Sequence, residues 1–328
     1  MKKFSKVLAS LVISGLALTM VPFNAFATGA MPTRLSGVTA PQTAIAIADR
    51  TGWTGTVILA SSTSYGMVDA LTAGPLAFYL KAPILLTGAG NELDRDTKAE
   101  LTRLSVRTVY VTSGTAVIKQ GVIDELKGMG ITVIPLGGYD RYETSVNIAK
   151  QMTGVTKVAI ANSIPDALSI ASIASANNEP ILLTEKDAIP ASVSAYLATN
   201  PGITSSDVIG GTGVISDTVR LELPSASRYF GVTAYDTNNE VIQNFASSLK
   251  FDNVYFANGE TEIDALAGAP LAAMTNSPIV LTDGKSVPAV NNFIIKKSSA
   301  YTVRTALGGE AVVPETIRFA IPSGPIEH

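Results

Sequence analysis

The chain of 328 residues contains no cysteine, and its single histidine, His328, is the last residue. Without cysteine there is no disulfide framework and no zinc site of cysteine and histidine ligands. A Ser-His-Asp or Cys-His arrangement would have to take its base from the terminal residue, which argues against nucleophilic catalysis of that type. We therefore predict no metal and no cofactor, and carboxylates remain the only groups suited to acid-base chemistry.

Aromatic residues and positive charge are also scarce. Aromatics make up 6% of the chain, with Trp53 as the sole tryptophan, so a sugar-stacking platform is poorly supplied. The formal net charge is −3, and removal of residues 1–27, which hold three lysines and no acids, makes it −6. This balance argues against nucleic acid as a partner, since nucleic acid requires a basic face. An acidic polymer would have to be bound through local arginines.

Residues 1–27 have the layout of a secretory signal peptide. A lysine-rich start precedes a largely apolar stretch at 7–21, and small residues at 25–27 resemble a cleavage site. A membrane anchor is the alternative, but the apolar run is short for spanning a bilayer. No thiol for lipidation and no terminal sorting signal is found. We expect a secreted protein that has no membrane contact after removal of the signal peptide and is held at the cell surface without a covalent bond.

The most informative feature is a pair of phrases that occurs three times. A D-A-L triplet begins at Asp69, Asp166 and Asp264, and each is followed fourteen residues later by P-I-[LV]-L-T. The spacing is about 97 residues, and a unit of that size can hold its own core. A glycine followed six residues later by threonine recurs near each unit start, at Gly37, Gly138 and Gly231. The chain is therefore a triplicated domain.

Within each unit, short apolar runs alternate with helical patterns. The predicted strands are 56–59, 84–86, 108–111 and 131–134 in the first unit, 157–160, 181–183 and 207–209 in the second, and 253–256, 279–281 and 301–303 in the third. In the first unit, helices are predicted from 44, at 68–80 with a weak point at Gly74-Pro75, at 94–104 with Asp94 as N-cap, and at 116–127. Such a pattern indicates a parallel sheet covered on both faces. The fold class is α/β, three-layered and doubly wound, and the predicted units are 28–136, 137–227 and 228–328.

The recurrent residues have structural and functional interpretations side by side. Each D-A-L aspartate either caps or charges the start of a helix, or contacts a ligand, or acts as a catalytic carboxylate. The I-[LV]-L triplets are either core strands or strands whose ends, at Thr87, Thr184 and Thr282, meet a ligand. The glycine phrases around Gly114 and Gly211 form tight turns or cradle a phosphate. Arg34, Arg141 and Arg228 are exposed charges or the cations for an acidic polymer.

Together these phrases resemble the cell wall-binding repeat 2 family of secreted and surface-layer-associated proteins of Gram-positive bacteria. The family pattern is similar to Gly138–Thr144, to Pro165–Leu168 and to the three P-I-[LV]-L-T stretches, and it covers about residues 34–322. The resemblance implies three tandem Rossmann-like repeats packed as a pseudo-threefold, triangular module. It also implies non-covalent tethering to anionic wall polymers, with the I-L-L region implicated in binding. The first and third units depart from the D-R-Y-E phrase, which only the second keeps around Asp140, Arg141 and Glu143.

We accordingly predict a non-catalytic protein that attaches to the cell wall by binding an anionic, teichoic-acid-like polysaccharide. The alternatives are a wall-acting hydrolase that uses the repeat carboxylates and a self-assembling surface-layer protein. The candidate polymer-binding residues are the recurrent arginines, the acidic residues of the repeated phrases and the apolar triplets: Arg34, Arg141, Arg228, Asp140, Glu143, Asp69, Asp166, Asp264, Ile84, Leu85, Leu86, Ile181, Leu182, Leu183, Ile279, Val280 and Leu281.

Overall fold

The structure is a computed structural model that describes residues 33–285, 291–298 and 302–319. The predicted signal peptide at 1–27 and His328 lie outside the described residues. Among the described helices, none has both the length and the apolar character needed to cross a membrane.

The described residues form three four-stranded sheets in which every strand pair is parallel. The sheets have equivalent strand orders, and their strands, from one edge to the other, are as follows: β3 (Ile84–Thr87), β2 (Thr56–Ser61), β4 (Thr108–Val111) and β5 (Thr132–Pro135) in the first; β7 (Ile181–Leu183), β6 (Lys157–Ala161), β8 (Ser205–Ile209) and β9 (Ala226–Tyr229) in the second; β11 (Ile279–Thr282), β10 (Asn253–Asn258), β12 (Val303–Leu307) and β1 (Arg34–Leu35) in the third. The α/β prediction with three repeats is confirmed.

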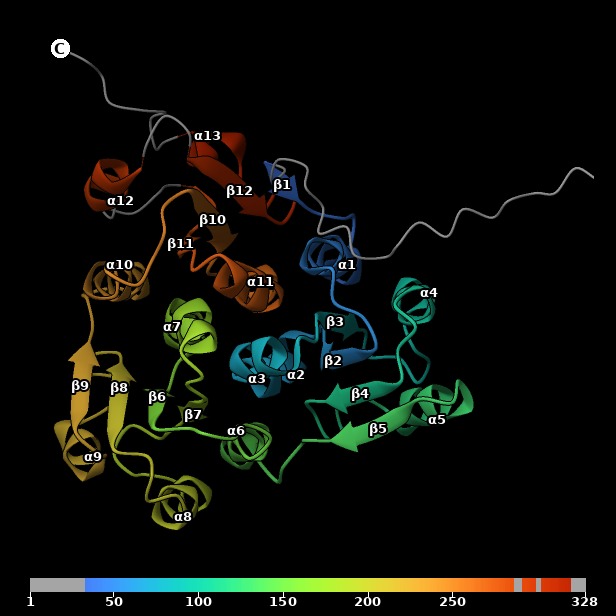
Figure 1. Ribbon diagram of the computed structural model, residues 1–328, viewed down its shortest axis with the longest axis horizontal. Coiled ribbons are helices and arrows are strands. Elements are labelled where there is room, and N and C mark those ends of the chain that lie inside the picture. The colour runs from blue at the N-terminus through green and yellow to red at the C-terminus, as the bar shows by residue number, and fades with distance from the viewer. Residues whose placement is uncertain (1–32, 286–290, 299–301, 320–328) are drawn as a thin grey trace, which may run out of the picture.

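The fourth strand of each sheet belongs to the chain segment that begins the next repeat. After β5 the chain enters the Gly138 phrase, and after β9 it enters the Gly231 phrase. The third sheet takes its fourth strand from the start of the chain, because β1 pairs with β12 through Arg34 opposite Ala306 and Leu35 opposite Leu307. The three units therefore form a closed ring, drawn as a triangle in Figure 1. The predicted unit boundaries 28–136, 137–227 and 228–328 stay predictions.

Three helices, one from each repeat, pack against one another at the centre of the triangle (Figure 1). They are α3 (Ala73–Leu80), α7 (Ile164–Ala176) and α11 (Ile263–Met274). These helices are rich in Ala, Ser and Gly, so their backbones approach closely. A Cβ added at Gly74 of α3 would lie 3.2 Å from both the Ala269 Cβ of α11 and the Ser175 Oγ of α7. The Ala and Leu of each D-A-L triplet are buried in this central core.

The remaining helices surround the sheets. They are α1 (Ala40–Thr51), α2 (Ser64–Ala70), α4 (Arg95–Arg103), α5 (Gln120–Gly128), α6 (Arg141–Ala149), α8 (Ala191–Thr199), α9 (Asp217–Glu222), α10 (Ala234–Asn244), α12 (Asn291–Lys297) and α13 (Glu315–Arg318). The helices α1, α6 and α10 follow the three Gly-to-Thr phrases and start the repeats. Each sheet is thus covered by a central helix on one face and by outer helices on the other.

Both faces of every sheet are buried, which explains the wholly apolar strands. In β3, Leu85 faces the core of its own unit, whereas Ile84 and Leu86 face the shared central core. The same division holds in the second and third units, where Leu182 and Val280 face the outer cores. The middle residue of each I-[LV]-L triplet therefore stabilises one unit, and its neighbours join the three units together.

The predicted element bounds were accurate for the central strands and less so elsewhere. The N-cap at Asp94 is confirmed, since its carboxylate accepts the N–H groups of Asp96 and Thr97. The single helix predicted at 68–80 is wrong, because α2 ends at Ala70 and α3 begins at Ala73, before the Gly74-Pro75 pair. The strand predicted at 301–303 was placed too early, since β12 covers Val303–Leu307. The helix predicted from 116 begins only at Gln120.

Candidate functional site

The strand order places a topological switch point in each unit. In the first unit the chain runs from the inner strand β2 to the edge strand β3 and then crosses back to β4, on the other side of β2. The loops that follow the neighbouring strands β2 and β4 therefore lead in opposite directions. Ligands of open α/β sheets bind beyond the carboxyl ends of strands at such points. In Figure 1, the arrowhead of β5 is directed toward α6 and that of β9 toward α10. Each switch point therefore faces the start of the next repeat.

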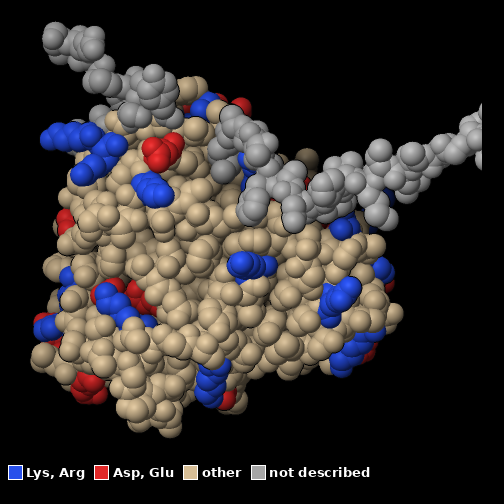
Figure 2. All heavy atoms as spheres, viewed as in Figure 1, with Lys and Arg blue, Asp and Glu red and all other residues tan. Residues whose placement is uncertain are grey.

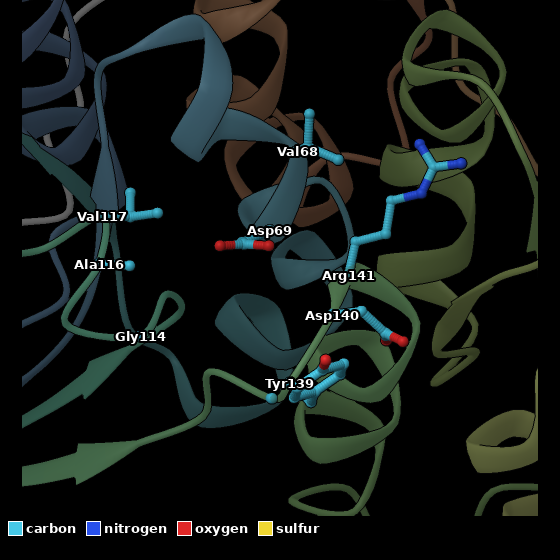
Figure 3. Close-up of a pocket in the computed structure, with 9 residues that line it drawn as sticks. Val68, Asp69, Gly114, Ala116, Val117, Tyr139, Asp140 and Arg141 are labelled. Carbon is cyan, nitrogen blue, oxygen red and sulfur yellow. The ribbon is translucent and has the colours of Figure 1, made fainter.

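A cavity of about 360 Å³ lies at the junction between the first and second units. Its walls come from α2, from the loop after β4 and from the Gly138 phrase. The lining residues are Val68, Asp69, Gly114, Ala116, Val117, Gly138, Tyr139, Asp140 and Arg141. Figure 3 shows the side chains of Asp69 and Val117 on one side and those of Asp140 and Tyr139 on the other. The first unit and the second thus build one site together.

An equivalent cavity of about 390 Å³ lies at the junction between the second and third units. Its lining residues are Ser163, Pro165, Asp166, Gly210, Gly211, Gly213, Val214, Gly231, Val232, Thr233, Ala234 and Thr237. Asp166 corresponds to Asp69, Gly211 to Gly114, Val214 to Val117 and Gly231 to Gly138 by the repeat spacing. Most of the phrases that recur in the sequence therefore meet in space at the junctions.

The third junction is formed by β1. The amide of Gly308 donates to the Leu35 carbonyl at 2.9 Å, as the amide of Gly210 donates to Tyr229 at the second junction. Asp264 lies beside Gly308, whose φ of +102° and close approach to the Asp264 carboxylate exclude a side chain at that position. The residues of the third junction correspond to those of the first two.

Asp166 and Asp264 are buried carboxylates with few internal hydrogen-bond donors, whereas Asp69 is only half-buried. Asp166 is 4% exposed, and its Oδ2 accepts the Ser163 hydroxyl at 2.6 Å. Burial raises the pKa of Asp166 to about 6, against the smaller opposing effect of that hydroxyl. Burial also raises the pKa of Asp264 to about 6. Burial raises the pKa of Asp69 as well, although the Ser113 hydroxyl favours its ionised form.

The prediction that each aspartate caps or charges the start of a helix holds for Asp166 and Asp264 as a first-turn charge, but none of the three is an N-cap. The N-cap residues are Ser163 for α7 and Glu262 for α11, and Ser163 Oγ accepts the Asp166 N–H. Asp166 and Asp264 do lie in the first turns of their helices, where a negative charge is favoured. Asp69 instead lies in the last turn of α2. The carboxylates therefore line the junctions without capping a helix.

The Gly-to-Thr phrase is a helix-capping device in all three units. The amides of Gly37, Gly138 and Gly231 donate to the hydroxyl of the threonine six residues later, at 2.9–3.0 Å. In the second unit, Asp140 Oδ1 accepts the Glu143 N–H and Glu143 Oε2 accepts the Tyr139 N–H. In the first and third units, Thr39 with Gln42 and Thr233 with Asp236 form capping boxes. The first and third units lack the D-R-Y-E residues, but the residues at the same positions still cap the following helix.

The three predicted arginines fall into two structural classes. Arg34 donates to the carbonyls of Gly308 and Val313 at 2.7 and 2.9 Å and pairs with Glu315. Arg228 donates to the carbonyls of Gly210 and Ser216 in the same manner.

Arg141 differs from these two, because it follows its glycine by three residues whereas Arg34 and Arg228 precede theirs. Its Nη2 donates to Asn162 and to the Tyr142 hydroxyl at 3.1 Å. Only Arg141 of the three lines one of the two described cavities.

The apolar triplets lie in the core and not at the cavities. All nine residues are at most 3% exposed, which leaves their side chains no surface for a ligand: Ile84, Leu85, Leu86, Ile181, Leu182, Leu183, Ile279, Val280 and Leu281. The threonines at the strand ends are buried too, and their hydroxyls fix the following turns. Thr87 accepts the Asp94 N–H, Thr184 donates to the Ala188 carbonyl and Thr282 accepts the Gly284 N–H.

Sequence reasoning missed the exposed apolar residue that follows each phrase glycine. Val38, Tyr139 and Val232 are 95%, 97% and 99% exposed, and Tyr139 and Val232 line the two cavities. Their shared position directly after the glycine was the available signal. No group of His, Cys, Asp or Glu suited to hold a metal ion occurs among the described residues.

Comparison with known proteins agrees with this architecture. The model of the family described as Cell wall binding domain 2 (CWB2) matches residues 34–123, 136–220 and 228–318. The N-acetylmuramoyl-L-alanine amidase LytC of Bacillus subtilis (strain 168) is 33% identical over 234 residues, which cover 71% of this chain and 46% of the relative. The amidase enhancer of the same organism is 33% identical over 279 residues, covering 83% and 37%. The chain spans less than half the length of these curated relatives.

Two solved structures share the fold. Cwp6 from Clostridium difficile superposes with a TM-score of 0.82 at 28% identity, covering 90% of this chain and 49% of that one. Cwp8 from the same organism gives a TM-score of 0.75 at 26% identity, covering 86% and 50%.

Proposed function

This chain belongs to the cell wall binding domain 2 family, and on that basis we propose that it attaches to the bacterial cell wall without a covalent bond. The proposed partner is an anionic wall polymer, and the proposed location is the cell surface after secretion. The relatives LytC and the amidase enhancer bear names that refer to wall amidase activity, which supports a wall location. The junction cavities are the proposed binding sites; Asp69, Asp140 and Arg141 line the first and Asp166 lines the second.

The observation that carries this proposal is the recurrence of one cavity at two junctions of a rigid ring. Acid-base catalysis by paired carboxylates needs two groups in unequal surroundings, whereas the two cavities repeat the same aspartate, glycine loop and valine. Equivalent weak sites on one frame bind a repeating polymer with avidity, because the first contact raises the effective concentration for the second. A repeating ligand therefore suits this molecule better than a single small substrate.

Co-sedimentation with isolated walls tests the proposal. Purified protein lacking residues 1–27 should sediment with Gram-positive walls and remain in solution without them. Binding should be lost after chemical removal of the phosphodiester-linked and other anionic polysaccharides. Binding that survives this extraction would contradict a polymer partner, and sedimentation of the protein alone would favour the self-assembling alternative.

A wall-acting hydrolase is the second candidate, which the amidase-related relatives favour. Two carboxylates, Asp69 and Asp140, line the first cavity, but Asp140 caps α6 and accepts the Glu143 N–H at 2.8 Å. Among the described residues that line the second cavity, Asp166 is the only acid. Paired acid and base catalysis needs two carboxyl groups in unequal surroundings. Release of soluble muropeptides, abolished in the Asp166→Asn variant, would favour the hydrolase.

A further inference from the structure

The second cavity offers no positive charge to an anionic ligand. None of the described residues that line it is Lys or Arg. Arg228, the nearest of the predicted cations in the sequence, is 10% exposed at its side chain and is held by two backbone carbonyls and Asp217. The buried Asp166 carboxylate is the one charge at the cavity wall. A phosphate or carboxylate group placed there would meet a like charge.

The first cavity has one lining cation, Arg141, beside the carboxylates of Asp69 and Asp140. Figure 3 shows the guanidinium of Arg141 directed away from the Asp69 carboxylate. Its Nη2 is engaged by Asn162 and by the Tyr142 hydroxyl. On the face in Figure 2, basic side chains are scattered over a largely uncharged surface, apart from a group at the upper left of the view. The arrangement is unlike the basic grooves that bind polyanions through their charge.

Few side-chain donors reach the buried carboxylates of Asp166 and Asp264, whereas the half-buried Asp69 accepts from the Ser113 hydroxyl. Among the described residues, Asp166 accepts a side-chain hydrogen bond only at Oδ2, from Ser163, and the Asp264 carboxylate accepts none. Both residues are more than nine-tenths buried. A buried carboxylate without sufficient donors destabilises the fold, yet an aspartate occurs at this position in all three units. A ligand that donates hydrogen bonds accounts for its retention.

An exposed apolar side chain lies at the same cavities. Tyr139 is 97% exposed beside Asp69, and Val232 is 99% exposed beside Asp166. Phe230, 53% exposed, lies against the Gly211 loop, where an added Cβ would be 3.2 Å from its ring. An aromatic ring that carries a hydroxyl group suits a ligand that has both an apolar face and hydrated polar groups. A sugar ring has this dual character, with an apolar C–H face and hydroxyl donors at its edge.

We propose that the junction cavities bind neutral sugar residues of the wall polymer, whose hydroxyls donate to Asp69 and Asp166 and whose ring faces cover Tyr139 and Val232. The polymer's anionic groups remain outside the cavities. This inference rests on the proposed function, that the chain binds a wall polymer, and specifies what part of that polymer is recognised. The volumes of about 360 and 390 Å³ fall in the range of small-molecule sites.

The first experiment measures wall binding against ionic strength and against loss of the apolar contact. Raising NaCl from 0.05 to 0.5 M should change the affinity of the wild-type protein by less than about threefold, because screening weakens charge pairs and not hydroxyl contacts. Tyr139→Ala should lower affinity by about five- to tenfold. The matched control, Leu221→Ala, removes a 73% exposed apolar side chain from α9 and should bind as wild type.

The second experiment uses soluble competitors. Neutral oligosaccharides prepared from the same walls by dephosphorylation should displace the protein, whereas glycerol phosphate at equal concentration should not. Displacement by glycerol phosphate alone would overturn the inference in favour of a phosphate site. Stronger displacement by glucosamine than by glucose would overturn it in favour of an ammonium site at the carboxylates.

The outcomes separate the inference from the proposed function. If the wild-type protein does not sediment with walls, both are refuted. If it sediments but is released by 0.5 M NaCl, or if Tyr139→Ala binds as tightly as Leu221→Ala, the neutral-sugar inference is refuted while wall attachment stands. Because Tyr139 is almost fully exposed, its removal is not expected to unfold the protein.

Discussion

Asp166→Asn should stabilise the protein at neutral pH and weaken its binding to walls. Burial raises the pKa of Asp166 to about 6 from an ordinary value of about 3.9. The folded state therefore holds the proton more tightly than the unfolded state. The stability that this carboxyl contributes is complete below about pH 4, is lost as the pH rises from 4 to 6, and changes little above that. At pH 7 the ionised form costs up to about 3 kcal/mol, which a neutral amide of the same shape avoids.

The measurement is the difference in free energy of unfolding between the variant and the wild type in urea. We expect a difference near zero at pH 4 and a gain of about 1 to 3 kcal/mol for Asp166→Asn at pH 7.5. The variant must be compared with the wild type at each pH, because other buried groups also make the stability of both proteins depend on pH. Burial raises the pKa of Glu179 to about 8 and that of Glu262 to about 7. Asp124→Asn, at an exposed position of α5, is the control and should change stability by less than about 0.5 kcal/mol.

Wall binding supplies the second half of this prediction. A hydrogen bond to a carboxylate exceeds one to an amide by about 1 kcal/mol, so the affinity of Asp166→Asn should fall about fivefold. A variant that is less stable than the wild type at pH 4 and at pH 7.5 alike would refute the reasoning. Such a result would mean that the carboxylate serves the fold and not a ligand.

Three further substitutions test the ring and its junctions. Arg34→Ala removes two bonds to carbonyls and an ion pair between β1 and the third unit, and should lower the free energy of unfolding by about 2 to 4 kcal/mol. Urea unfolding and cleavage by added protease near β1 would report it. Arg228→Ala, in the strand β9 between α9 and α10, should be cleaved no faster than wild type. Gly138→Ala places a Cβ 2.6 Å from Glu143 Cβ and should lower the free energy of unfolding, measured by thermal unfolding, by about 1 to 3 kcal/mol. The control Gly128→Ala has open space around it and should leave stability unchanged or raise it. Equal effects of the two substitutions would contradict the steric argument. Gly74→Leu should force α7 and α11 apart and cost about 3 kcal/mol in the same assay, and an unchanged unfolding temperature would show that the central contact is loose.

The central strands could be predicted because burial on both faces of a sheet requires short, continuous runs of apolar residues. The run at 108–111 matches β4, and the run at 181–183 matches β7. The two strands that were not predicted, β1 and β9, are short and include arginine, and β1 gains its partner from a segment about 270 residues away. Pairing over such a separation leaves no local signal. Of the two helices on either side of the unpredicted break, α3 packs against α7 and α11, from the second and third repeats.

Some of the residues that line the cavities could be predicted from the sequence, but the arrangement of the cavities at the junctions between units could not. Asp69, Asp166 and Asp140 do line the junctions, because aspartates that follow strands reach the carboxyl ends of a sheet. Arg34 and Arg228 recur in the sequence for a structural reason, since they tie the glycine loops to the fourth strand. Recurrence alone does not distinguish a residue that holds the ring from one that lines its cavities. Exposure and hydrogen-bond partners do.

Under the proposed function, the binding module is the junction and not the single repeat. Each cavity takes its aspartate and glycine loop from one unit and its capping phrase from the next, so an isolated unit would hold only half a site. β1 brings the Gly37 phrase to the third sheet as the chain brings Gly138 and Gly231 to the first two. Closure of the ring therefore turns three units into three junctions, where an open chain would have two. A polymer-binding protein gains most from this closure, because every added junction is another contact on the same rigid frame.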